Sequence, residues 1–269
     1  MDKTAPVKTA ETRVRNGDVT LAVTRRGAGG QKLIFFNGCG AAQVVWNQVI
    51  GQLKGDYEII TFDFRGHGKS SPAPDHSFEA FLGDAECVME AVGGGQPIVV
   101  GWSLGADLAL AYAAARPGAL GGLVIVDGAV PLADRLVEDE AGMRRLLNSV
   151  SMKVSMFLLR LTAWRYSLSG DAIADITMDV DARRQNMLGL YSQLDCPATM
   201  VLATRSAGPN TTAHARRNNR LWREGAERLA SACPSLPIRW LEAGHRLPLS
   251  RPAELAGTID TFAEGLRQD

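Results

Sequence analysis

Short apolar runs alternate with stretches of helical spacing along most of the chain. Such runs are typical of strands that a parallel sheet buries on both faces. The predicted strands are 12–15, 19–24, 32–36, 57–62, 96–102, 123–126, 199–203 and 237–241, and the predicted helices are 41–53, 78–92, 107–116, 215–232 and 252–266. This alternation predicts an α/β fold, a mostly parallel twisted sheet with helices on both faces.

Between residues 132 and 194 the alternation stops. This block has no convincing strand but several helical patches rich in leucine and methionine. We therefore expect a core of residues 1–131 and 195–269 and an inserted helical cap of residues 132–194. Such an insertion would cover the carboxyl ends of the strands, where open α/β sheets bind ligands.

Methionine and aromatic side chains of the cap suit an apolar ligand of irregular shape. Most of them are expected to pack the cap against the core, and some to line a pocket. The predicted substrate-binding residues are Met152, Met156, Trp164, Met187 and Tyr191, together with Trp102 of the core. A tryptophan at position 102 has a second interpretation, packing beneath the neighbouring turn.

The composition narrows the function classes. Lysine plus arginine and aspartate plus glutamate balance at 29 each among 269 residues, so net charge favours neither nucleic acid nor an anionic membrane. The first ten residues lack the apolar region of a secretory signal, and no run approaches the roughly 20 apolar residues of a membrane span. The four cysteines lack metal-ligand spacing, which favours free thiols in a reducing compartment. We expect a soluble cytoplasmic protein with no metal, organic cofactor, nucleic-acid partner or membrane.

The segment Gly101–Gly105 places Ser103 between two glycines, where a predicted strand gives way to a helix. This pattern at such a switch is typical of a nucleophile elbow, a strained turn that exposes the serine hydroxyl. The alternative is a glycine-rich turn with an ordinary serine. The flanking strand and helix favour a catalytic serine.

A catalytic serine needs a base within hydrogen-bond reach, because its hydroxyl is a poor nucleophile near neutral pH. His245 follows a predicted strand and a glycine in the last loop of the sheet, and we predict that it is this base. His67, in an arginine–glycine turn, is better explained as a structural hydrogen-bonding group. His76 and His214 lie in polar loop segments.

Four segments carry a family resemblance, in the family's order. They are Phe36–Cys39, similar to a His-Gly-x loop with Asn37 in place of histidine, Asp63–Ser70, similar to D-x-R-G-x-G-x-S, Gly101–Gly105, and Ala243–His245. Over nearly its whole length the chain resembles an α/β-hydrolase with a helical cap. The resemblance implies the α/β-hydrolase fold, a serine esterase-like or lactonase-like activity, and an oxyanion hole formed by the backbone N–H groups of Cys39 and Leu104.

The acid of the triad departs from the family's commonest pattern, in which it follows the strand after the cap. No aspartate occurs from Cys196 to His245. The resemblance offers a second location, the end of the strand after the elbow helix, and Asp127 occupies it. A carboxylate there would orient the imidazole, so the predicted triad is Ser103, His245 and Asp127. The alternative is a structural aspartate.

Three further features can be explained by a structural role as well as by a functional one. Cys39 suggests thiol chemistry, but no basic residue lies near it in sequence to lower its pKa. Asp107 is predicted to interact with a helix dipole rather than to catalyse. Five arginines at positions 205, 216, 217, 220 and 223, with no acidic residue between the first and the last, usually form a solvated helix face. The alternative is docking of a carboxylate substrate or an acidic carrier protein.

The sequence predicts a serine hydrolase that cleaves an ester or lactone of a mostly apolar small molecule through an acyl-enzyme. C–C bond hydrolysis, thioester cleavage and haloperoxidase-like perhydrolysis use the same triad and stay open. A non-catalytic ligand-binding protein with the same fold is the alternative from another class.

Overall fold

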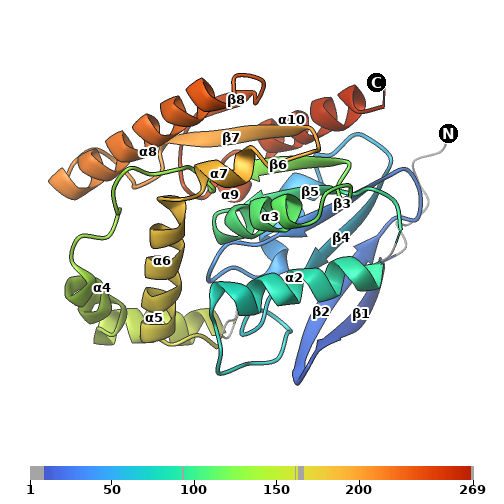
Figure 1. The fold of residues 1–269 in the computed structure, drawn as a ribbon. Helices are drawn as coiled ribbons and strands as arrows, with labels where there is room; N and C mark the ends of the chain where they lie inside the picture. Colours follow the sequence, from blue (N-terminus) through green and yellow to red (C-terminus); the bar gives the residue numbers. More distant parts are fainter. Residues whose placement is uncertain (1–8, 93, 161, 163–166, 268–269) are drawn as a thin grey trace.

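The computed structural model describes residues 9–92, 94–160, 162 and 167–267 of the chain. In this part of the chain eight strands form one sheet in the order β1-β2-β4-β3-β5-β6-β7-β8 (Figure 1). The strands are β1 (Thr9–Asn16), β2 (Val19–Arg26), β3 (Gln31–Phe36), β4 (Tyr57–Phe62), β5 (Ile98–Trp102), β6 (Gly122–Val126), β7 (Ala198–Arg205) and β8 (Ile238–Gly244). Only β2 runs antiparallel to its neighbours β1 and β4 among these strands, and the other pairs are parallel. The predicted, mostly parallel sheet is confirmed.

The helices follow the predicted pattern with two differences. They are η1 (Gln43–Trp46), α1 (Asn47–Ile50), α2 (Phe78–Val92), α3 (Leu104–Ala115), α4 (Glu140–Leu147), α5 (Val150–Arg160), α6 (Gly170–Arg184), α7 (Leu188–Tyr191), α8 (Ala213–Ala232), α9 (Leu247–Ser250) and α10 (Pro252–Gly265). The helix expected at 41–53 is a 3-10 turn followed by one α turn, and the short α9 was not predicted. None of the helices in the described residues has the length and apolar character needed to cross a membrane.

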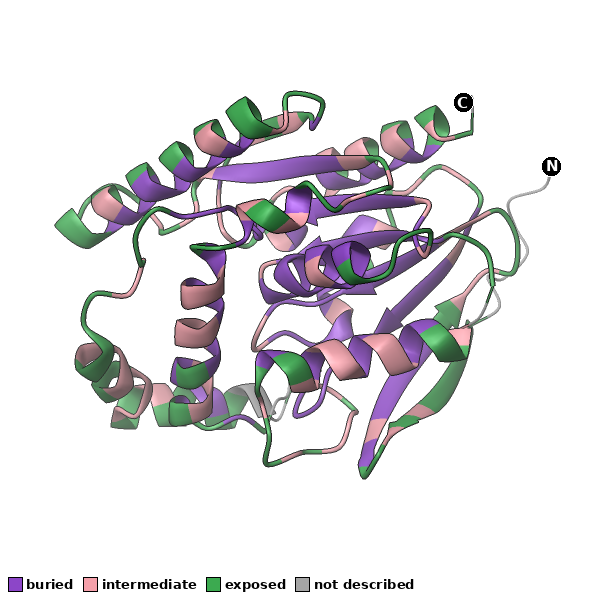
Figure 2. Ribbon diagram, viewed as in Figure 1, coloured by how far each residue is buried: buried purple, intermediate pink, exposed green. Residues whose placement is uncertain are grey.

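The central strands are buried because each presents side chains to two cores. Ile34 and Phe36 of β3 belong to a cluster with residues of α2, α3 and α8. Leu33 and Phe35 of the same strand belong to a second cluster with residues of α1, α9 and α10. Figure 2 shows the resulting layers, with the buried strands between helices whose outer faces are exposed. Burial on both faces explains the continuous apolar runs in the sequence.

The segment between β6 and β7 carries α4, α5, α6 and α7 (Figure 1). Helix α6 is joined to α3 by a buried ion pair, in which Arg184 donates from Nε and Nη2 to the two carboxylate oxygens of Asp107, at 2.9 and 2.7 Å. Burial alone would lower the pKa of Arg184, but attraction to Asp107 outweighs it and the pKa is raised. Asp107 lies in the first turn of α3, as expected, and its carboxylate is in addition neutralised by Arg184 of α6.

Candidate active site

Ser103 lies in the sharp turn between β5 and α3, with φ 56° and ψ −125°. A positive φ is unfavourable for a residue with a side chain, so the surrounding turn must enforce it. A Cβ at Gly105 would overlap the carbonyl oxygen of Phe36, and a Cβ at Gly101 would overlap the carbonyl oxygen of Gly105. Both positions therefore require glycine, and the close packing holds the turn in its strained form.

Gly105→Ala is expected to destabilise the fold by about 3 kcal/mol or more, because the added methyl group overlaps backbone that has no free space to move into. For a chain of this size that corresponds to a fall in Tm of roughly 6–12 °C. Thermal unfolding followed by circular dichroism measures it. Gly257→Ala in α10 is the matched control, since nothing lies within 4 Å of its Cβ position, and an equal Tm for the two variants would contradict the prediction.

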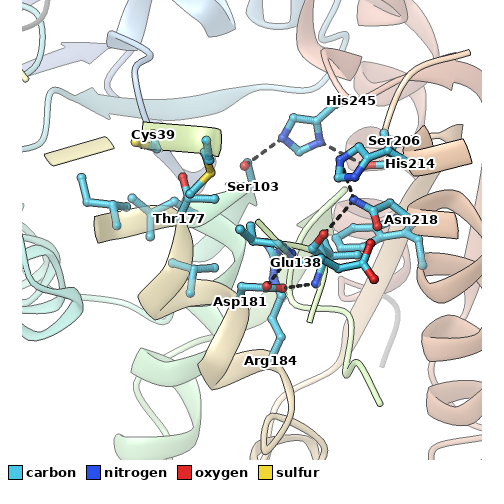
Figure 3. Close-up of a pocket in the computed structure, with 18 of the residues that line it drawn as sticks. Cys39, Ser103, Glu138, Thr177, Asp181, Arg184, Ser206, His214, Asn218 and His245 are labelled. Atoms are coloured by element: carbon cyan, nitrogen blue, oxygen red, sulfur yellow. Dashed lines mark hydrogen bonds between the residues drawn. The ribbon is translucent and has the colours of Figure 1, made fainter. Parts of the chain in front are cut away.

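His245, just after β8, bridges the serine and the aspartate. Its Nε2 atom lies 2.9 Å from Ser103 Oγ, and its Nδ1 atom lies 2.7 Å from Asp127 Oδ2 (Figure 3 shows the serine and the histidine). The carboxylate fixes the tautomer: Nδ1–H donates to Asp127, which leaves Nε2 to accept the hydroxyl proton of Ser103. The structure thus brings together the three side chains that were predicted as a triad.

Asp127 follows β6 directly, in a backbone conformation with φ 41°. Its side chain is fully buried, and its backbone N–H donates to the carbonyl of Val201 in β7 at 2.8 Å. The carboxylate is surrounded by donors from β7, α8 and the loop after β7, besides the histidine. A buried carboxylate held in this way has one orientation, which faces the imidazole.

The two residues expected to form an oxyanion hole lie beside the serine, and Cys39 and Leu104 both line the same cavity as Ser103. Leu104 is the first residue of α3, so its N–H has no acceptor within the helix. The loop of Cys39 is fixed by its neighbour Gly40, whose N–H donates to Nε2 of His67 at 2.9 Å. The oxyanion hole itself stays a prediction, in which these two N–H groups stabilise a negative oxygen that develops next to Ser103 Oγ.

His67 and Asn37 have structural roles. Nδ1–H of His67 donates to the carbonyl of Arg65 at 2.8 Å, and burial lowers the pKa of His67, which favours the neutral ring. Asn37 is fully buried, donates from Nδ2 to the carbonyl of Phe62 at 2.7 Å, and accepts from Nε1 of Trp46 at 2.8 Å. The asparagine thus joins the loop after β3 to the end of β4 and to η1.

The thiol of Cys39 is expected to be unreactive in the native protein. Burial raises its pKa from 9.0 to about 12, so at pH 8 only about 1 in 10⁴ thiols is ionised, and the thiolate is the nucleophile. We expect iodoacetamide at pH 8 to leave Cys39 unmodified over hours, as read by peptide mass spectrometry. The urea-unfolded chain is the control, in which Cys39 should be alkylated. Rapid alkylation of Cys39 in the folded protein would contradict this prediction.

Above Ser103 lies a cavity of about 650 Å³. Apolar side chains come from α4 and α6, and polar side chains come from α6, α8 and the segment before α4 (Figure 3). Its lining residues include Met143, Leu146, Ile176, Val180, Thr177, Asp181, Arg184, His214, Asn218, Trp222 and Ser206. The lining therefore combines polar and apolar side chains, and apolar surface predominates, as expected.

Five of the predicted substrate-binding residues lie in the described part of the chain, and these five do not line this cavity. Met156, Met187 and Tyr191 are buried in the core, where the Tyr191 hydroxyl donates to the carbonyl of Ala129 at 2.6 Å. Met152 packs partly buried against the same core. Trp102 lies behind the histidine, with its Nε1–H donating to the carbonyl of His245 at 2.9 Å. Trp164 lies outside the described residues. The five described side chains pack within the protein, and other apolar residues, such as Met143, Leu146 and Ile176, face the cavity together with polar ones.

The arginine-rich segment contributes a helix face. Arg217 pairs with Asp134 at 2.6 Å, and Arg220 lies 3.7 Å from Glu224 one turn away on α8. Both acidic partners lie outside the arginine-rich segment 205–223. The two guanidinium groups are therefore paired although the segment itself contains no acidic residue. Arg220 is exposed, as the solvated-face interpretation predicts, whereas Arg217 is mostly buried and joins α8 to the segment before α4.

Comparison with known proteins agrees with the fold. The model of the alpha/beta hydrolase family matches residues 33–258. The chain is 32% identical over 117 residues to 2-(acetamidomethylene)succinate hydrolase of Mesorhizobium japonicum, covering 43% of this chain and 41% of the relative. It is 26% identical over 129 residues to pimeloyl-[acyl-carrier protein] methyl ester esterase of Wigglesworthia glossinidia brevipalpis, covering 48% of each chain. These alignments thus span less than half of either relative.

The crystal structure of E-2-(acetamidomethylene)succinate hydrolase superimposes with a TM-score of 0.70 at 21% identity, covering 96% of this chain and 100% of that one. At this identity the likeness concerns the fold. The family match spans most of the chain, including the elbow, the residue after β6 and the loop after β8. The chain belongs to the alpha/beta hydrolase family.

Proposed function

We propose that this protein is a serine hydrolase that cleaves an ester or lactone of a small molecule through an acyl-enzyme. The observation that carries the proposal is the continuous hydrogen-bond chain from Ser103 through His245 to Asp127, with links of 2.9 and 2.7 Å. A serine within 3 Å of an oriented imidazole is the arrangement that activates a hydroxyl. Ser103 and His245 line a cavity that is large enough for a small substrate.

In the proposed mechanism Ser103 Oγ attacks the carbonyl carbon while Nε2 of His245 takes the hydroxyl proton. The resulting oxyanion accepts hydrogen bonds from the N–H groups of Cys39 and Leu104. Collapse of the intermediate breaks the bond to the leaving oxygen, which receives the proton from His245. Water, deprotonated by the same imidazole, then attacks the acyl-enzyme and releases the acid and Ser103.

The mixed lining narrows the substrate class. We propose that residues 132–194 act as a cap that contributes most of the specificity, with the apolar part of the substrate against Met143, Leu146 and Ile176. A polar group of the substrate would face Asn218 and His214 of α8.

Charged substrates and partners have less support from the cavity. The guanidinium of Arg184 is already paired with the carboxylate of Asp107 at 2.7 Å, so a free carboxylate on the substrate has no strong partner there. Docking of an acidic carrier protein stays a prediction, which the pairing of Arg217 and Arg220 does not favour.

A substrate panel tests the proposal. It contains p-nitrophenyl esters of increasing acyl length, aliphatic lactones, a thioester and a substrate for C–C bond cleavage, all assayed with the folded full chain. We expect turnover of esters or lactones that carry a medium-length apolar group, with a burst of p-nitrophenol as the acyl-enzyme accumulates. Exclusive turnover of the thioester or of the C–C substrate would reassign the reaction, and no turnover of any class would favour the ligand-binding alternative.

A further inference from the structure

Ser206 lies immediately after β7 and reaches both partners of the proposed acid–base pair. Its Oγ–H donates to Asp127 Oδ2 at 2.8 Å, and the same oxygen lies 3.3 Å from His245 Nδ1. Figure 3 shows Ser206 beside His245 at the edge of the cavity, which both residues line. The hydroxyl therefore stands between the cavity and the contact of the carboxylate with the imidazole.

The carboxylate of Asp127 uses Ser206 as one of four donors. Oδ1 accepts from the backbone N–H of Ala203 at 2.9 Å and from Nε1–H of Trp222 at 3.2 Å. Oδ2 accepts from His245 at 2.7 Å and from Ser206 at 2.8 Å. An ionised carboxylate offers about four acceptor sites, so this one is fully satisfied. Because the group is completely buried, loss of one donor leaves a lone pair with nothing to replace it except water from the cavity.

The loop that carries Ser206 is held by the same helix that holds Asp127. Asn219 of α8 accepts from the N–H of Ala207 at 2.8 Å and donates from Nδ2 to the carbonyl of Gly208 at 2.9 Å. Trp222, less than one turn further along α8, donates to Asp127. Helix α8 therefore fixes the serine and the acid relative to each other, and the geometry around the imidazole does not depend on a free loop.

We propose that Ser206 is a positioning residue: its hydroxyl fixes the rotation of the Asp127 carboxylate toward His245 and takes up part of the negative charge on Oδ2. The inference rests on the proposed function. Without the hydroxyl, Asp127 Oδ2 keeps only its bond to His245, so the carboxylate is held less firmly toward Nδ1 and proton transfer slows.

Ser206→Ala tests this role, with Ser206→Thr as the conservative variant that keeps a hydroxyl and Ser231→Ala on the exposed face of α8 as the matched control. We expect Ser206→Ala to lower kcat by about 10- to 30-fold, the effect of one hydrogen bond to a charged group, with KM changed less than about twofold. Ser206→Thr should recover most of the rate, and Ser231→Ala should match the wild type.

A purely structural serine would change Tm but not kcat, so wild-type kcat in folded Ser206→Ala overturns the proposal. Equal loss in the alanine and threonine variants also overturns it, because the hydroxyl would then not be the acting group. If Asp127→Asn were as active as the wild type, the proposed triad itself would fall, which distinguishes failure of the proposed function from failure of this inference.

The 3.3 Å approach of Ser206 Oγ to Nδ1 makes a second test available. A carboxylate at position 206 is expected to reach the same nitrogen, so Ser206→Asp added to Asp127→Asn should raise kcat at least about 10-fold above Asp127→Asn alone. Asp18→Asn combined with Ser206→Asp is the control for the added charge. If the double variant keeps its fold by circular dichroism but shows no gain in kcat, a carboxylate at position 206 does not reach His245 Nδ1.

Discussion

Replacing Ser103 with alanine is expected to lower kcat by about 10⁴- to 10⁶-fold with little change in stability. The hydroxyl is the only group of the proposed triad that bonds covalently to the substrate, and its loss leaves the oxyanion donors and the cavity with only weak residual catalysis. Alanine fits the turn as well as serine does, because both residues carry a Cβ in the same strained conformation. Steady-state kinetics on the best ester or lactone of the panel measures the effect.

Ser231→Ala on α8 is the matched control, since its hydroxyl donates to the backbone of its own helix. It should retain the wild-type kcat. Residual activity of Ser103→Ala within about tenfold of the wild type would remove the serine from the proposed mechanism.

Asp127→Asn is expected to lower kcat by about 10³- to 10⁴-fold. In the wild type Oδ1 accepts from the N–H of Ala203 and from Trp222, so the amide oxygen of an asparagine would take this place and its NH₂ group would face His245. The amide then donates to Nδ1 and forces the ring proton onto Nε2, where it blocks transfer from Ser103. Kinetics over pH 6–9 measure the loss, and Asp18→Asn in the exposed β1–β2 turn is the control. Wild-type kcat in Asp127→Asn would assign Asp127 a structural role.

Elements with a local signal were predicted closely. The bounds of β4 and α2 agree with the expected ranges. An apolar run of strand length and an amphipathic helix can each be recognised from a short stretch of sequence. That the three residues of the proposed triad lie close together could also be predicted from the sequence. Each lies next to the end of a strand, and those ends meet at one edge of a parallel sheet.

The pocket was not predictable because its lining depends on how the inserted helices pack. Met187 and Tyr191 have the character of ligand-binding residues, yet both are buried in the core. Arg184 meets Asp107 at a separation of 77 residues, and no periodicity signals such a pair. Hydrophobic spacing identifies the apolar face of a helix but does not reveal whether core or cavity lies opposite.

Ser206 was missed for a different reason. The acid of a triad is most often an aspartate, and the segment after β7 contains none before His245. The signal in the sequence was a hydroxyl just after β7, the strand next to β6, which ends immediately before Asp127. Because β6 and β7 are paired in parallel, residues that follow them lie close together, so an uncharged polar side chain at that place can act on the acid as directly as a charged one.

In the proposed triad His245 and Asp127 make the Ser103 hydroxyl nucleophilic, and a fluorophosphonate probe measures this nucleophilicity. The folded chain is incubated with the probe, and intact mass with peptide mapping counts and locates the adducts. We expect one adduct per chain, on Ser103, which is absent in Ser103→Ala and forms far more slowly in Asp127→Asn. A folded wild-type chain that takes up no probe, or an adduct that persists in Ser103→Ala, would contradict this expectation.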